Sequence, residues 1–205
     1  MKDLKIKICG IKNLSTALLC IDEGVNYLGF NFSPKSIRQI SFKDAEIILN
    51  SISKQTHKVK NVALFYKNNM DEVNEIMNSK LFDYLQYVVH DESFERLKND
   101  NIKYIPQIGV SDELFENDLN YDDDLIILDS FQKEIGGGSG KIFPWSRVKS
   151  IRRNYLLAGG LNPDNVSEAI EVLQPYGVDV ASGVENENGE KDLLKIKRFI
   201  TNARR

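Results

Sequence analysis

The sequence predicts a single (β/α)8 barrel, the α/β fold in which a closed sheet of eight parallel strands is surrounded by helices. Short apolar runs recur along the 205 residues, and segments with helical spacing separate them. Strand–helix alternation indicates a parallel α/β fold, and near-continuous apolar strands are typical of a sheet covered on both faces. Eight such units favour closure into a barrel. An open, doubly wound sheet is the alternative.

The expected strands are short and rich in Leu, Ile, Val and aromatic residues. They run from Ile6 to Cys9, Tyr27 to Phe32, Val59 to Tyr66, Tyr84 to Val89, Tyr104 to Val110, Leu125 to Asp129, Tyr155 to Gly159 and Val178 to Ser182. All of these runs are much shorter than the roughly 18 residues that a membrane-spanning helix requires.

Helix signals lie between the strands in the same order. Asn13 and Ser41 each precede apolar residues at helical spacing, and their side chains are suited to cap a helix. Shorter helices are expected over Asp71 to Met77 and over Ser93 to Lys98. These segments supply the helical layer around the predicted sheet.

Two further helices are expected near the end of the chain. Asn162-Pro163 opens the first, because proline is tolerated in the first helical turn. The final helix runs from Asp192 to Ala203 and buries apolar side chains. These are Leu194, Ile196 or the stem of Lys197, Phe199 and Ile200.

Composition limits the class of protein. A hydrophobic content of 41% and a charged content of 28% are ordinary for a soluble protein, and we expect one domain over 1–205. The net charge of −3, with dispersed Lys and Arg, argues against nucleic acid as a partner. Two cysteines cannot form a disulfide framework, and the chain lacks a C-x-x-C pair for zinc. We therefore expect a cytoplasmic monomer that has no signal peptide, metal or membrane partner.

Polar residues and glycines follow several of the expected strands. They are Cys9, Arg38 in the segment after the second strand, Asp129, Gly159–Gly160 and Ser182–Gly183. Function in such barrels sits at the carboxyl ends of the strands. A thiolate can accept a proton, a partly buried carboxyl group can donate one, and a guanidinium binds carboxylates. Glycine turns that lead into helices suit phosphate.

Each of these residues also has a purely structural interpretation. Cys9 could be a small buried side chain, Asp129 a turn residue, Arg38 a solvated charge and Gly159–Gly160 an ordinary tight turn. Cys20 belongs to a helix face, and neither His57 nor His90 is assigned a role. The segment GGGSGK at residues 136 to 141 fails the P-loop pattern, because Ile135 and Ile142 occupy required positions.

Five segments resemble the phosphoribosylanthranilate isomerase family of tryptophan biosynthesis. They are KICGI, GFNFSPKSIR, IILDS followed by GGSGK and FPW, LAGGLNPDNV and VDVASGVENENGEKD, in the family's order between Lys7 and Asp192. The resemblance implies a (β/α)8 barrel, often called a TIM barrel, and an Amadori rearrangement without a cofactor. The implied substrate is N-(5′-phosphoribosyl)anthranilate, a small phosphorylated molecule.

The resemblance also implies roles for individual residues. Cys9 corresponds to the family's base and Asp129 to its acid, while Arg38 corresponds to its ligand for the anthranilate carboxylate. Backbone N–H groups after the seventh and eighth strands bind phosphate in the family. The corresponding residues here are Gly159, Gly160, Ser182 and Gly183.

The fourth strand departs from the family pattern, which usually ends in a sequence like QLHG. This chain reads LQYVVHDES, so Gln86 keeps the glutamine, now a candidate substrate ligand, while Val88 replaces the histidine. One alternative is the related sugar-phosphate barrel isomerase of histidine biosynthesis, which needs an Asp where Cys9 stands. Another is a barrel that binds a phosphorylated ligand without catalysis, and the retained Cys9, Asp129 and Arg38 argue against it.

Overall fold

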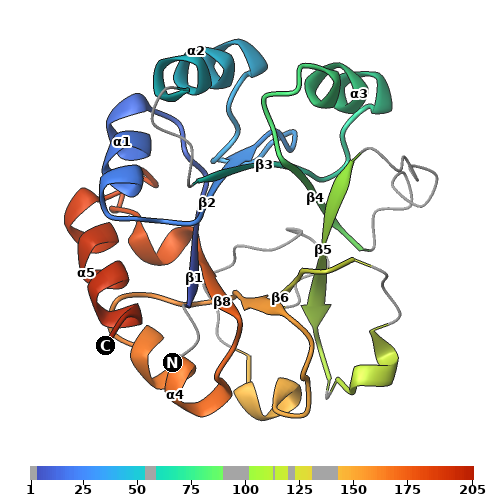
Figure 1. The fold of residues 1–205 in the computed structure, drawn as a ribbon, viewed down its shortest axis with the longest axis vertical. Coiled ribbons are helices and arrows are strands. Elements are labelled where there is room, and N and C mark those ends of the chain that lie inside the picture. Colours follow the sequence, from blue (N-terminus) through green and yellow to red (C-terminus); the bar gives the residue numbers. More distant parts are fainter. Residues whose placement is uncertain (1–3, 54–58, 90–101, 113, 120–122, 131–142) are drawn as a thin grey trace.

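The computed structural model is a closed barrel of eight parallel strands, each paired with its neighbours in sequence order. It describes residues 4–53, 59–89, 102–112, 114–119, 123–130 and 143–205. The strands are β1 (Lys5–Cys9), β2 (Tyr27–Asn31), β3 (Lys60–Phe65), β4 (Tyr84–Val88), β5 (Lys103–Val110), β6 (Ile126–Ser130), β7 (Tyr155–Leu157) and β8 (Gly177–Val180). Figure 1 shows them as a ring with helices outside it. The predicted barrel is confirmed, and the open sheet is excluded.

Five α-helices surround the described part of the barrel. They are α1 (Leu14–Asp22), α2 (Phe42–Ile52), α3 (Met70–Asn78), α4 (Val166–Leu173) and α5 (Leu193–Ala203). The predicted caps are confirmed, because Asn13 and Ser41 accept hydrogen bonds from the backbone N–H groups of Thr16 and Asp44. These caps satisfy donors that the first turn of a helix cannot pair internally.

The helical layer differs from the prediction in three places. In the described residues between β5 and β7, the helical elements are two 3₁₀ turns, η2 (Glu116–Asp118) and η3 (Trp145–Val148), rather than α-helices. The helix expected to open at Asn162-Pro163 begins only at Val166, because the Asn162 side chain accepts from Asp164 N–H and so stabilises a turn. The predicted helix at 93–98 and the GGGSGK segment lie outside the described residues.

The prediction was also wrong about Leu194, which is 74% exposed on α5. The buried face of that helix consists of Ile196, Phe199, Ile200 and Ala203. Their spacing of three and four residues forms one continuous stripe, and Leu194 lies off it. None of the helices in the described residues is long and apolar enough to cross a membrane.

The side chains inside the barrel change character along the strands. Ile105 and Ile127 belong to an apolar cluster in the barrel interior. Gln107 and Asp129 follow them by two residues on the same strands, so they share the inward face one step nearer the carboxyl ends. On these two strands the interior is therefore apolar toward the amino ends and polar toward the carboxyl ends, where a barrel places its chemistry.

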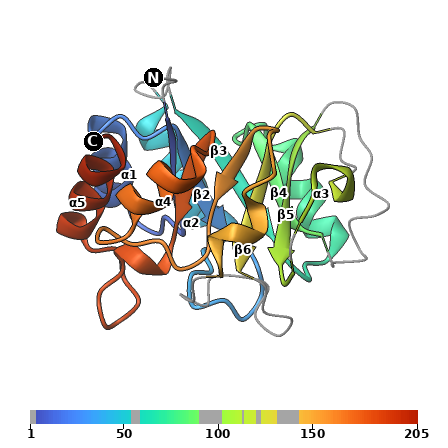
Figure 2. The same cartoon turned by 90° about the horizontal axis from the view of Figure 1, so that it is seen from below.

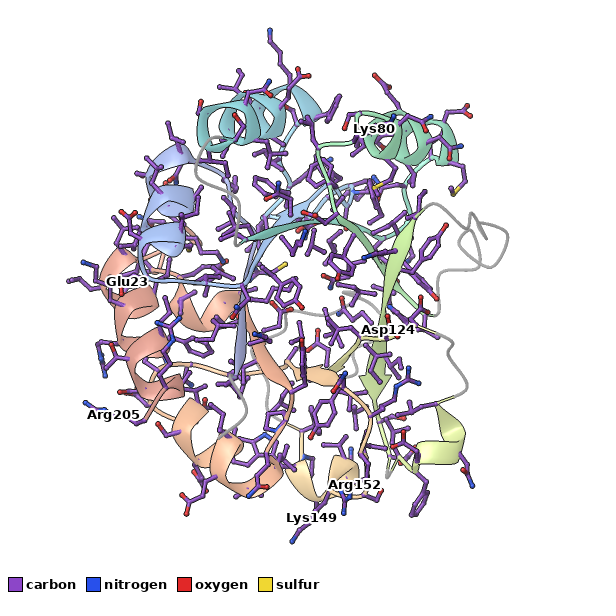
Figure 3. The ribbon with its side chains drawn as sticks, viewed as in Figure 1. Glu23, Lys80, Asp124, Lys149, Arg152 and Arg205 are labelled. Carbon is purple, nitrogen blue, oxygen red and sulfur yellow. The ribbon has the colours of Figure 1, made fainter. Side chains whose placement is uncertain are left out.

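The two views show where that end lies. In Figure 2 the arrow of β5 points downward, and the segments after β2 and β8 hang from the same lower side of the barrel. Charged residues such as Glu23, Lys80, Lys149 and Arg205 lie at the outer rim in Figure 3. Charge on the outer surface is solvated, whereas the polar groups inside the barrel must find partners there.

Candidate active site

Cys9 lies at the carboxyl end of β1 and is 6% exposed. Lys7, two residues earlier, shares its inward face. The neighbouring strand contributes Gly29, at which a Cβ atom would lie 3.0 Å from Cys9 Sγ and 3.1 Å from Lys7 Nζ. Any larger residue at position 29 would displace one of these two atoms. The thiol and the ammonium therefore share the space above Gly29.

The electrostatics of Cys9 are set by burial and by nearby charges. Burial raises the pKa of the Cys9 thiol, and Lys7 and Lys191 oppose that rise with positive charge while Asp179 adds to it. Burial also raises the pKa of Cys20, to about 12, and this thiol sits in α1 as predicted. Lys191 acts on both thiols, whereas the further positive charge of Lys7 acts on Cys9.

Asp129 is held from two sides near the carboxyl end of β6. Its Oδ1 accepts the backbone N–H of Ser130 at 2.7 Å, and its Oδ2 accepts Nε2 of Gln107 at 2.7 Å. The carboxyl group is 6% exposed. These contacts fix the orientation of the carboxyl group inside the barrel.

Gln86 lies deeper than the sequence analysis expected of a substrate ligand. It is 1% exposed, and its Nε2 donates to Oε1 of Gln107 at 2.8 Å. Gln86 is therefore linked to Asp129 through Gln107. The sequence analysis missed Gln107, although an amide within the apolar run YIPQIGV was a signal, because a buried amide needs a polar partner.

Arg38 reaches the carboxyl end of the barrel, as the sequence analysis predicted, but its guanidinium is already paired. Nε and Nη2 donate to the two carboxylate oxygens of Glu185 at 2.7 and 2.9 Å. Lys191 Nζ donates to the same carboxylate at 2.6 Å. A Cβ atom at Gly10 would lie 3.1 Å from Arg38 Cδ and 3.4 Å from Lys191 Nζ, so both cations lie close to the end of β1.

Glu185 and Lys191 were missed by the sequence analysis. Both belong to the segment VENENGEKD, in which several charged residues stand among polar ones, so the sequence does not indicate which of them are buried. The structure separates them, because the side chains of Glu185 and Lys191 are 6% and 3% exposed. Buried charges of this kind require partners, and here they partner each other and Arg38.

The turns after β7 and β8 lie against one another. Gly159 and Gly160 have φ values of +83° and +69°, which favour glycine. A Cβ atom at Gly183 would lie 1.8 Å from the carbonyl oxygen of Leu161, so this position admits no side chain. Among the described residues, the backbone N–H groups of Gly160 and Gly183 have no acceptor. Ser182 begins the 3₁₀ turn η4 (Ser182–Val184) beside them.

Fold and site together define an enzyme of the (β/α)8-barrel class, with ionisable groups inside the carboxyl end of the barrel. The family model for N-(5′-phosphoribosyl)anthranilate (PRA) isomerase matches residues 6–202. The chain belongs to this family.

Individual relatives agree with the family match. An N-(5′-phosphoribosyl)anthranilate isomerase from Leptospira borgpetersenii is 43% identical over 98% of this chain and 94% of its own. The crystal structure of the Thermotoga maritima phosphoribosyl anthranilate isomerase is 38% identical, with a TM-score of 0.84 over 98% of each chain. A structure of the isomerase in complex with reduced 1-(o-carboxyphenylamino)-1-deoxyribulose 5-phosphate is 34% identical, with a TM-score of 0.80 over 98% of each chain.

Acid should weaken the cluster around Glu185. Burial acts to raise the pKa of this carboxyl group, but hydrogen bonds and positive charge from Arg38 and Lys191 outweigh it and hold the pKa below its ordinary value. The contribution of Glu185 to stability is therefore complete above about pH 4.5 and is lost as the pH falls through the folded-state value. Urea unfolding above and below this range should show Glu185→Gln losing less stability on acidification than the wild type. The exposed Glu171→Gln is the control, and an equal loss in all three proteins would contradict the prediction.

Proposed function

We propose that the chain catalyses the reaction for which its family is named, the Amadori rearrangement of N-(5′-phosphoribosyl)anthranilate. The product is 1-(2-carboxyphenylamino)-1-deoxyribulose 5-phosphate, an intermediate of tryptophan biosynthesis. The observation that carries the proposal is the placement of Cys9 and Asp129 at the carboxyl ends of two strands of one barrel. The Arg38 guanidinium is close enough to both side chains for their charges to raise its pKa.

The rearrangement divides into two proton transfers. Asp129 protonates the furanose ring oxygen, the C1′–O bond breaks, and the nitrogen lone pair forms a Schiff base. Cys9, as the thiolate, then removes the proton from C2′, and the electron pair moves into an enolamine that tautomerises to the ketone. One carbon is oxidised and its neighbour reduced within the same molecule, so the balance needs no external electron carrier. Positioned acid–base groups of this kind are each worth roughly 10²–10⁴ in rate.

The paired guanidinium of Arg38 can still receive a carboxylate. Glu185 occupies Nε and one proton of Nη2, and Nη1 has no partner among the described residues. The free edge of the guanidinium can therefore bind the anthranilate carboxylate through charge-assisted hydrogen bonds. Glu185 keeps the guanidinium in one orientation while that happens.

The phosphate is proposed to bind at the carboxyl end of the barrel, against the turns after β7 and β8 and on the side opposite Arg38. The support is the pair of N–H groups of Gly160 and Gly183 that lack an acceptor among the described residues. Gly159 allows the turn its positive φ, and the Ser182 hydroxyl is a further donor. Gln86, by contrast, supports Asp129 through Gln107 rather than contacting substrate.

We further propose a cytoplasmic monomer. The larger exposed apolar side chains are spread over separate segments of the described chain, as with Ile47 on α2, Phe115 after β5 and Leu194 on α5. One related structure is that of monomers generated from the dimeric isomerase of Thermotoga maritima. Light scattering during size-exclusion chromatography decides between one copy and two.

The base and acid assignments predict the effect of two substitutions. Cys9→Ala and Asp129→Ala should each lower kcat for the isomerisation by at least about 10², because each removes a proton-transfer group. Circular dichroism should show both variants folded. Cys20→Ala, which alters the other buried thiol, should keep the wild-type kcat. Wild-type turnover by folded Cys9→Ala would end the base assignment.

Arg38 should act on binding more than on chemistry. A charge-assisted pair to the substrate carboxylate is worth roughly 1.5–3 kcal/mol, so Arg38→Ala should raise KM by about ten- to a hundredfold. Lys35→Gln, at an exposed position of the same segment, is the matched control. If KM were the same in Arg38→Ala and wild type, the guanidinium would not be the carboxylate ligand.

The phosphate proposal predicts where an inorganic anion binds. A crystal grown with phosphate should hold the anion within about 3 Å of the Gly160 and Gly183 nitrogens, on the far side of Cys9 and Asp129 from Arg38. Inorganic phosphate should also inhibit competitively, because it would occupy part of the substrate site. An anion bound at residues 136–141 instead would overturn this placement and the substrate orientation with it.

A further inference from the structure

Lys7 is a lysine with no exposed surface, on an inner position of a barrel strand. Its Nζ donates to Oδ1 of Asp179 at 3.0 Å, and β1 and β8 pair these two residues directly in register. Lysine is almost never fully buried unless it is paired. Breaking a buried ion pair is costly, yet replacing one by apolar residues often stabilises a protein, so the pair itself is weak evidence of a role in stability.

The ammonium has a second neighbour besides Asp179. A Cβ atom at Gly29 would be within 3.1 Å of both Lys7 Nζ and Cys9 Sγ, so the nitrogen and the sulfur line the same small space. Burial alone would lower the pKa of Lys7, but Asp179 and Cys9 together hold it above its ordinary value. The side chain thus carries a full positive charge between a carboxylate and a thiol.

We propose that Lys7 is a positioning residue of the isomerisation: its ammonium is the counter-ion of the Cys9 thiolate, and Asp179 shares and orients that ammonium. The proposal rests on the proposed role of Cys9 as the base. A thiolate in this buried site needs a cation, since an isolated buried charge is very unfavourable. When Cys9 takes the substrate proton and becomes neutral, Lys7 remains paired with Asp179.

Within the part of the chain that the structure describes, four charged groups act on Cys9 from the elements packed around it. Lys7 on β1 and Asp179 on β8 act in opposite directions, and Lys191 follows η4. Arg38, from the segment after β2, is the fourth. Arg38 and Lys191 both donate to Glu185, so that carboxylate offsets part of their charge. Lys7 and Asp179 therefore act on Cys9 in opposite directions. The positive charge of Lys7 favours the thiolate, and the negative charge of Asp179 favours the thiol.

This opposition separates an electrostatic role from a structural one. Lys7→Met and Asp179→Asn each remove one charge of the same ion pair, so a purely structural role of that pair would change the two variants alike. An electrostatic role shifts the titration of Cys9 upward in Lys7→Met and downward in Asp179→Asn. Lys60→Met is the matched control, because Lys60 forms an exposed pair with Asp83 at the opposite end of the strands.

The titration is measured on ligand-free enzyme by the ultraviolet absorbance of the thiolate against pH. Each protein is compared with its own Cys9→Ser version, which removes the signals of Cys20 and the tyrosines. The midpoint for Cys9 should rise by about one to two pH units in Lys7→Met, the worth of a charge-assisted hydrogen bond. It should fall in Asp179→Asn and stay unchanged in Lys60→Met. The acidic limb of kcat/KM against pH should move with each midpoint, which lowers kcat/KM of Lys7→Met near neutral pH by about ten- to a hundredfold.

The outcomes distinguish this proposal from the proposed function. Unchanged midpoints, or shifts in one direction for both variants, would overturn the role of Lys7 even if Cys9→Ala abolishes turnover. Shifted midpoints with an unshifted kcat/KM profile would overturn Cys9 as the base, and the present proposal with it. If Lys7→Met does not fold, the double variant Lys7→Met/Asp179→Asn replaces it. Its midpoint should then lie above that of Asp179→Asn alone.

Discussion

The pairing of the first strand with the last is the constraint on which the site depends. β1 lies beside β8 over four residue pairs, from Lys5 with Gly177 to Ile8 with Val180. At Gly177 the backbones approach so closely that a Cβ atom would lie 2.3 Å from the carbonyl oxygen of Lys5. This closure brings residues from the two ends of the chain into one small volume.

Closing the sheet into a barrel explains both ion pairs that join distant parts of the chain. The contact between Lys7 and Asp179 joins residues 172 apart in sequence, and the contact between Arg38 and Glu185 joins residues 147 apart. An open sheet would leave β1 and β8 at different places, and these charges would then be buried without partners. Since unpaired buried charges are strongly unfavourable, the ion pairs also favour the closed register over shifted ones.

Much of this architecture could be predicted from the sequence because it depends on local signals. Apolar runs located the strands, Asn13 and Ser41 located two helix starts, and Cys9 and Asp129 stand toward the carboxyl ends of their strands. The prediction of a helix start at Asn162-Pro163 was wrong, because side chains there accept backbone hydrogen bonds and stabilise a turn instead of a helix. The prediction that Leu194 is buried was wrong because apolar character alone does not indicate which face of a helix is covered.

The pairings between distant residues could not be predicted in the same way. Nothing in the local sequence indicates that Gln86 donates a hydrogen bond to Gln107, or that Arg38 pairs with Glu185 rather than with solvent. Lys7 stands in an apolar strand as an ordinary exception to the pattern, and its partner is supplied by the last strand. Such contacts depend on register and closure, which only the three-dimensional structure provides.

The contact between the turns after β7 and β8 also has an evolutionary consequence. With the hydrogen of Gly183 facing the Leu161 carbonyl, the two turns cannot drift apart in sequence independently of each other. An insertion in one would require a compensating change in the other. If these turns hold the phosphate as proposed, changes in substrate preference should arise more readily elsewhere at the carboxyl end of the barrel than at this contact.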